Sequence, residues 1–363
     1  PPLPPPSKHK NRGTWVAQRL SVCLWLRELF HYEPASSSPT PPACVSSLAG
    51  TLLLSTIGPG IAGNIFVFVN YMCIFFWDTK KKSTHLILIH LAFTNIILLF
   101  SKVTLKTIEI FGLRNFPDDT GCKTFVYLER VARGLSICTT SLLTVVQATT
   151  ISPRASVRAS FKPASTCRTL SFFLFLWILN SLLSMNLLYY MKNVSSLNSS
   201  QFGQSGRYCY FLPASQTMKW MFLILMALRD FLFLGLMAWA SVYMVLILHK
   251  HHKHARYLQK SKVLYHIPPE IRAAQSVLLL MLCFLFFHWA DCIISLHLQS
   301  LLENKFIMLI IVDISTVGYA IVSPFVLIHR DGRLIEKHMI KLYPWTGVGG
   351  RKQKLGILKC GTP

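Results

Sequence analysis

The sequence predicts an all-α membrane protein, a bundle of seven transmembrane helices with its amino terminus outside. Three observations lead to this fold class. The 363 residues are 52% hydrophobic and only 14% charged, with a mean hydropathy of +0.44, as expected for a chain solvated mostly by lipid. The apolar residues gather in seven stretches of about 20 or more residues, the length that crosses a bilayer as a helix. The basic residues gather in alternate loops between these stretches, and their distribution gives the orientation.

Each apolar stretch is expected to be a helix, because backbone groups in lipid must find hydrogen-bond partners within their own segment. Strands would need a closed barrel built from alternating segments of about ten residues, a pattern that this sequence lacks. The seven predicted spans are residues 46–76, 85–108, 123–151, 169–191, 218–248, 273–298 and 305–328.

The orientation follows from lysine and arginine, which are in excess in cytoplasmic loops. The loops after the first, third and fifth spans are basic, and so is the tail, whereas the loop after the second span sets Arg114 against Asp118 and Asp119. We therefore place the amino terminus outside and residues 329–363 inside, as a basic cytoplasmic tail. The net charge of +23 is then chiefly a topology signal and argues against nucleic-acid binding. A basic inner face attracts anionic membrane lipid and an acidic partner.

Residues 1–45 differ from the rest of the chain, because they are rich in proline and serine and place five cations on the outer side. We expect them to be a disordered tail or the product of a mis-predicted exon, and residues 46–328 to form the seven-helix domain. The loop after the fourth span holds the sequons Asn193-Val194-Ser195 and Asn198-Ser199-Ser200. Asn193 and Asn198 are therefore candidate N-glycosylation sites, the alternative being unmodified polar loop residues.

The third span carries charges in its outer part, Glu129, Arg130 and Arg133. A charge in lipid costs at least a few kcal/mol, so such residues face a protein interior, pair with one another or line a solute pathway. Glu129 and Arg133 are four residues apart and share one helix face, where they can form an ion pair. An internal ion pair and a ligand contact both remain open for these two residues.

Several stretches of the sequence carry a family resemblance over residues 46 to 342. The third span reads ERVARGLSICTTSLL and continues into QATTISPR; the others are LRNFPDDTGCK, PPEIRAAQSVLLLMLCFLFFHWADCI and SPFVLIHRDGRL. They resemble vomeronasal type-1 (pheromone) receptors, a branch of the G-protein-coupled receptors. The departures from the wider rhodopsin-like class are shared by that branch: Asn95 stands where most rhodopsin-like receptors carry an Asp, and Ser323-Pro324 stands in place of Asn-Pro.

The resemblance implies a multi-pass plasma-membrane receptor in vomeronasal sensory neurons. It would detect a small chemosignal and activate a heterotrimeric G protein of the Gi/o class, with Arg154 and Arg158 as candidate G-protein contacts. It also implies a disulfide between Cys122, at the outer end of the third span, and Cys209 in the following outer loop, the alternative being two unpaired thiols. The ten cysteines show no metal-ligand spacing. No enzyme motif is visible, and neither a cofactor nor a metal is expected.

Further charges of the later spans lie at the same outer depth as those of the third. We expect a ring of mixed charge around one cavity between the helices, where bundles bind ligands. The apolar walls would come from Tyr127, Phe287 and Trp289, although aromatic residues of a bundle helix more often serve packing. The expected ligand-binding residues are Glu129, Arg133, Arg229, Asp230, Asp291 and Asp313.

The histidine-rich run 249–254 is assigned to the third inner loop. We interpret it as a basic surface for the G protein and lipid headgroups rather than a zinc site, since no carboxylate or thiolate lies nearby in the sequence. Two other functions remain as alternatives. A multi-pass transporter or channel would show internal repeats, and none is visible. A non-signalling relic of a receptor gene is the second.

Overall fold

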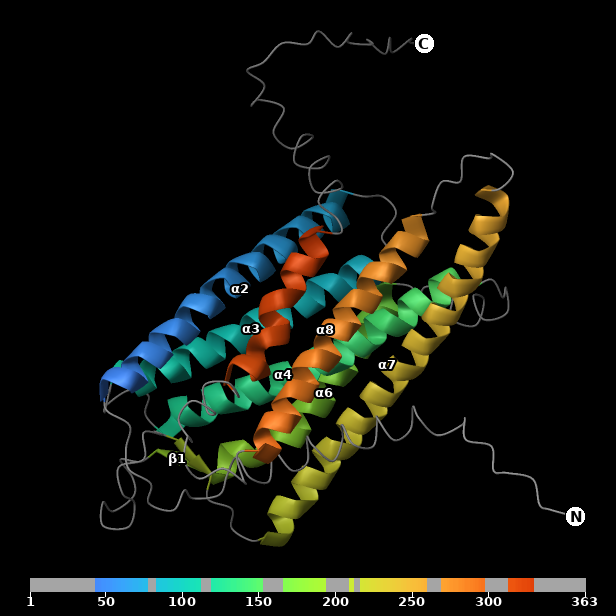
Figure 1. The fold of residues 1–363 in the computed structure, drawn as a ribbon. Helices are drawn as coiled ribbons and strands as arrows, with labels where there is room; N and C mark the ends of the chain where they lie inside the picture. Colours follow the sequence, from blue (N-terminus) through green and yellow to red (C-terminus); the bar gives the residue numbers. More distant parts are fainter. Residues whose placement is uncertain are drawn as a thin grey trace, which may run out of the picture.

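The structure of the protein is a computed structural model. It describes residues 43–77, 83–111, 119–152, 166–193, 209–211, 216–259, 269–297 and 313–329. A helix lies at each of the seven predicted spans, and the helices run alternately up and down a single bundle (Figure 1). The helices are α2 (Ala43–Trp77), α3 (Ser83–Phe111), α4 (Asp119–Ile151), α6 (Thr166–Tyr190), α7 (Gln216–Gln259), α8 (Pro269–His297) and a last helix, Asp313–His329.

The helices have the length and composition that a membrane requires. Five of them, α2, α3, α4, α6 and α7, are long and apolar enough to cross a bilayer, and the last two contain the shorter apolar stretches Ala274–Ala290 and Asp313–His329. The all-α membrane class is therefore confirmed. One small sheet accompanies the helices, formed by β1 (Met191–Asn193) and β2 (Cys209–Phe211) paired antiparallel, with Asn193 opposite Cys209.

The sheet lies at one end of the bundle, beside the start of α4, with which β1 is in contact. We call this end the sheet end. In Figure 1 the carboxyl ends of α3 and α8 point toward it, as do the amino ends of α4, α7 and the last helix. Ser152, which follows α4, marks the opposite end.

One prediction about helix α7 was wrong. The histidine-rich run 249–254 is not a loop, because α7 continues through it to Gln259. No glycine or proline follows in the chain until Pro268, so nothing in the local sequence breaks the helix after it leaves the apolar stretch.

Helix α4 is the centre of the bundle. It contacts α3, α6, α7 and α8 (Figure 1), and 72% of its apolar membrane-spanning stretch is buried. By contrast α6 and α7 expose large apolar side chains, such as Leu174 at 63% and Trp239 at 77%. Polar side chains are found inside instead, among them Asn95 and Thr140. A protein solvated by lipid is expected to show this arrangement, with apolar groups outward and polar groups paired within.

Helix α2 packs closely against the last helix where two glycines face it. A Cβ atom on Gly60 would lie 3.1 Å from the Cα atom of Ile321, and one on Gly63 would lie 3.0 Å from the ring of Pro324. The small residues thus allow backbone contact, as is typical of membrane helices. Here Asn64 donates hydrogen bonds across the interface to the carbonyl of Ala320, at 2.8 Å, and within its own helix to that of Gly60, at 2.7 Å.

Candidate functional site

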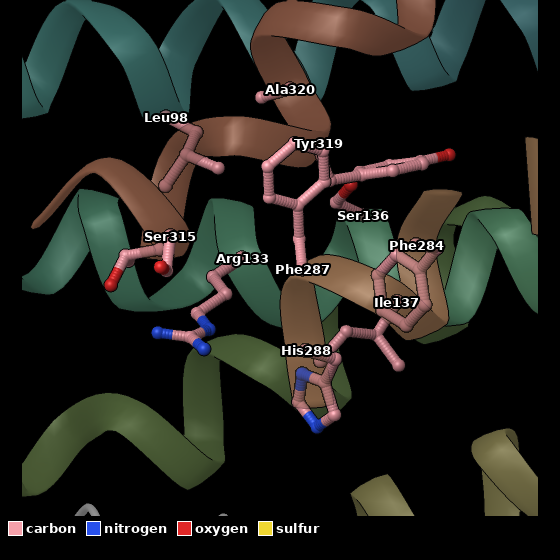
Figure 2. Close-up of a pocket in the computed structure, with 11 residues that line it drawn as sticks. Leu98, Arg133, Ser136, Ile137, Phe284, Phe287, His288, Ser315, Tyr319 and Ala320 are labelled. Atoms are coloured by element: carbon pink, nitrogen blue, oxygen red, sulfur yellow. The ribbon is translucent and has the colours of Figure 1, made fainter. Parts of the chain in front are cut away.

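A cavity lies inside the bundle between four helices, α3, α4, α8 and the last helix. Figure 2 shows side chains of all four converging on it. The lining residues are Leu98, Arg133, Ser136, Ile137, Phe284, Phe287, His288, Ser315, Thr316, Tyr319 and Ala320. Apolar rings and aliphatic groups make up most of this wall, with a few hydroxyl groups, one imidazole and one guanidinium among them. That mixture is typical of sites for small organic molecules.

The cavity is small in this conformation, about 30 Å³, which holds on the order of one or two water molecules. Phe287 occupies part of the adjoining space, because its ring packs against the Cα atom of Gly318, where any Cβ atom would collide with it. A larger ligand therefore requires Phe287 or a neighbour to move.

A charged cluster lies one helical turn from the cavity, on its sheet-end side. Its centre is Lys102 of α3, whose Nζ atom lies 3.2 Å from Oε1 of Glu129 and 2.9 Å from Oδ1 of Asp313. Lys106 reaches the other oxygen of Asp313 at 2.7 Å. Lys102 and Asp313 are buried and Glu129 is largely so. We call these four residues the lysine cluster. It joins α3, α4 and the last helix through charges that are mutually compensated.

The side of the cavity away from the sheet end is bounded by a network of uncharged polar groups. Asn95 donates to Ser323 at 3.0 Å and to Asn64 at 3.3 Å, and it accepts a hydrogen bond from Ser136 at 3.0 Å. Thr140 and the hydroxyl of Tyr319 share a hydrogen bond of 2.9 Å. Ser136 and Tyr319 also line the cavity, so it lies between a charged layer and a neutral polar layer.

A second charged group lies on another side of α4. Arg229 of α7 donates to Asp230, with Nη2 2.6 Å from Oδ1, and to Oδ1 of Asn180 on α6 at 2.8 Å. The guanidinium reaches α4 at Gly134, where a Cβ atom would collide with Arg229 and with Asn180. Glycine at this position is therefore what lets the group pack against α4. We call Arg229, Asp230 and Asn180 the arginine group. None of the three is among the residues that line the cavity.

The structure thus divides the predicted ring of charge. Arg133 lines the cavity, Glu129 and Asp313 belong to the lysine cluster beside it, and Arg229 and Asp230 lie apart from it. The side chain of Asp291 lies outside the described residues. The salt-bridge partner of Glu129 is Lys102 on the neighbouring helix rather than Arg133 on its own.

Of the three predicted wall residues only Phe287 lines the cavity. Tyr127 packs against the apolar contact of α4 with α6, and Trp289 is 44% exposed. The sequence reasoning missed Lys102, Lys106 and His288. A signal for the lysines was present, since two cations four residues apart in the outer third of an apolar span need anionic partners.

Several predicted site residues lie partly or wholly outside the part of the chain that the structure describes. Arg154, Arg158 and Asn198 are not among the described residues. The backbones of Cys122, Cys209 and Asn193 lie in α4, β2 and β1, but their side chains are outside the part that the structure describes. The disulfide and the glycosylation sites therefore stay predictions.

The chain resembles one receptor family in sequence and squid rhodopsin in fold. The model of the vomeronasal organ pheromone receptor family matches residues 48–340. Vomeronasal type-1 receptor 46 of Mus musculus is 32% identical over 306 residues, 84% of this chain and 96% of the relative. Vomeronasal type-1 receptor 100 of Rattus norvegicus is 34% identical over 287 residues, 78% of this chain and 85% of the relative. The crystal structure of squid rhodopsin matches 86% of this chain and 91% of its own with a TM-score of 0.61 at 16% identity, a likeness of fold alone.

Proposed function

The chain belongs to the vomeronasal organ pheromone receptor family, and from that premise we propose that it binds a small chemosignal in the cavity and activates a Gi/o-class G protein. A member of this family with a rhodopsin-like fold is a receptor of the G-protein-coupled type in the plasma membrane, not an enzyme. We further propose expression in vomeronasal sensory neurons, a receptor domain over residues 46–328 and a basic tail over 329–363.

The proposed ligand site is based on the cavity between the helices. It lies in the interior of the bundle and combines apolar rings with the hydrogen-bonding groups of Arg133, His288 and Ser315. Such a wall suits a compact organic molecule with one or two polar groups. The lysine cluster next to it supplies a charged boundary that can discriminate between ligands.

The sheet end is proposed to face outward. The sequon at Asn193 begins in β1, and Cys209 lies opposite it in a sheet that contacts the helix carrying Cys122, which suits an outer loop held by a disulfide. Cys209→Ala is then expected to hold the chain in the endoplasmic reticulum. Normal surface labelling of this variant would contradict the proposed disulfide.

The opposite end is proposed to meet the G protein. There the hydroxyl groups of Ser152 and Tyr243 share a hydrogen bond of 2.8 Å, and α4 and α7 pack through a cluster that includes Ile151 and Met244. A shift of α7 relative to α4 in response to ligand would change the surface at this end of the bundle. We propose Arg154 and Arg158, which follow Ser152 in the chain, as G-protein contacts.

Two phenylalanines that are adjacent in α8 test the ligand site. Phe287 lines the cavity, whereas Phe286 is 67% exposed on the surface of the helix bundle. In cells that express the receptor behind a signal sequence and are challenged with a chemosignal panel, Phe287→Ala should change the rank order of ligands at matched surface levels. Phe286→Ala should leave it unchanged. Equal rank orders in both variants would place the ligand elsewhere.

Coupling is tested in the same cells through inhibition of adenylyl cyclase. The response should disappear after pertussis toxin treatment, which disables Gi/o proteins, and should fall in a double variant with Arg154→Ala and Arg158→Ala. A toxin-resistant response would exclude the Gi/o class. A full response in the double variant would exclude these two contacts alone.

A further inference from the structure

The carboxylates of the lysine cluster are neutralised by lysines of the protein itself. Lys102 places one ammonium between Glu129 and Asp313, with N–O distances of 3.2 and 2.9 Å. Building on the proposed ligand cavity, we propose that Lys102 is a specificity-determining residue. Its ammonium occupies the cation site that Glu129 and Asp313 form beside the cavity, and so excludes ligands that carry an alkylammonium group.

The position of the site makes it relevant to a ligand in the cavity. Leu98 and Arg133 line the cavity, and Lys102 and Glu129 follow one turn nearer the sheet end on the same two helices. Asp313 precedes the lining residue Ser315 by two positions. A ligand of a few carbon atoms in the cavity would thus place one end beside the two carboxylates.

The ammonium group of Lys102 shows that the two carboxylates form a site for a cation. Glu129 and Asp313 come from different helices, yet both direct an oxygen at one Nζ atom, and all three side chains are shielded from solvent. An amine ligand would have to displace Lys102 and leave its charge buried without these partners, which strongly disfavours binding. A ligand without a cationic group meets no such penalty.

Shortening Lys102 should open the site to free amines. In Lys102→Ala the long side chain is gone, Glu129 loses its partner, and Asp313 keeps Lys106. An added n-butylammonium ion can then replace the lost chain and its charge. Binding to the folded state raises the midpoint of thermal unfolding, by an amount that grows with the ratio of free ligand concentration to the dissociation constant.

The test is thermal unfolding of the purified full chain in detergent, with n-butylammonium as the probe and 1-butanol as its neutral counterpart. Lys102→Ala should be stabilised by butylammonium at concentrations at least about tenfold lower than wild type requires, and 1-butanol should not reproduce the effect. Lys123→Ala is the matched control, since the described residues give Lys123 no salt bridge. Adding Glu129→Gln to Lys102→Ala should weaken the response.

If Lys102→Ala does not yield folded protein, butylammonium in the growth medium should restore its surface level, and the absence of rescue would overturn the inference. In folded Lys102→Ala, a response to butylammonium equal to that of wild type or of Lys123→Ala would also overturn it. The readout requires neither a chemosignal nor a G protein. Failure of the proposed function would instead appear as a wild-type receptor that is silent to the whole chemosignal panel.

Discussion

The lysine cluster and the arginine group lie on different sides of helix α4 and use charge in different ways. In the lysine cluster the opposite charges come from three helices, and each contact crosses a helix interface. In the arginine group the ion pair joins adjacent residues of α7, and a neutral amide on α6 completes it. The first arrangement depends on how three helices are placed, whereas the second fixes one guanidinium against Gly134. We infer that the lysine cluster responds to ligand and that the arginine group is a scaffold.

Breaking the arginine group should give the largest effect on stability. Arg229→Met removes the guanidinium and leaves Asp230, only 5% exposed, without it. Removing one partner of a buried ion pair typically costs about 3–5 kcal/mol, so the variant should reach the surface poorly. The double variant with Asp230→Asn should recover part of the loss. Surface labelling would contradict the scaffold role if Arg229→Met were expressed like wild type.

Breaking the lysine cluster at Glu129 should have an intermediate effect. Glu129→Gln keeps the shape of the side chain, and Lys102 retains Asp313 at 2.9 Å, so the loss should be about 2 kcal/mol, the scale of one hydrogen bond to a charged group. The decrease in the thermal unfolding midpoint of the purified protein measures this loss of stability. Because Lys102 rather than Arg133 is the partner, Lys102→Met should compensate for Glu129→Gln, whereas Arg133→Met should not. Equal compensation by both would contradict the assigned pair.

The smallest effect is expected at the edge of the lysine cluster. Lys106 is more exposed than Lys102, and Asp313 retains Lys102 when Lys106 is replaced. Lys106→Ala should therefore change the free energy of unfolding by no more than about 1 kcal/mol, as is usual for partly solvated pairs. A larger loss than that of Glu129→Gln would reverse the order proposed for the two lysines.

The sequence predicted the seven helices because hydropathy and length are properties of each segment alone. It also predicted that charges such as Glu129 and Asp313 lie near one another, since their depths in the bundle can be counted along each helix. It did not predict which of them pair. That depends on the rotation of each helix about its axis, and the charge pattern of one helix does not determine how its neighbours are rotated.

Two residues show that the sequence pattern of one helix does not determine which side chains pair. Glu129 and Arg133 share one face of one helix and could pair by their spacing, yet the salt-bridge partner of Glu129 is on α3. The depth of Arg229 in its span predicts a place at the cavity, but its guanidinium packs against Gly134 on another side of α4. Hydropathy alone predicts that α7 ends with its apolar stretch, whereas the helix continues through the histidine-rich run to Gln259.

The most direct test compares two carboxylates at matched surface expression. Glu129→Gln alters the lysine cluster and Asp230→Asn alters the arginine group, and each replaces one charged oxygen by an amide of the same shape. Ligand rank order over a chemosignal panel should change in Glu129→Gln and stay as in wild type in Asp230→Asn, even where the second variant needs more transfected DNA to reach equal surface levels. A changed rank order in Asp230→Asn together with an unchanged one in Glu129→Gln would contradict the assignment of ligand recognition to the cavity beside Lys102.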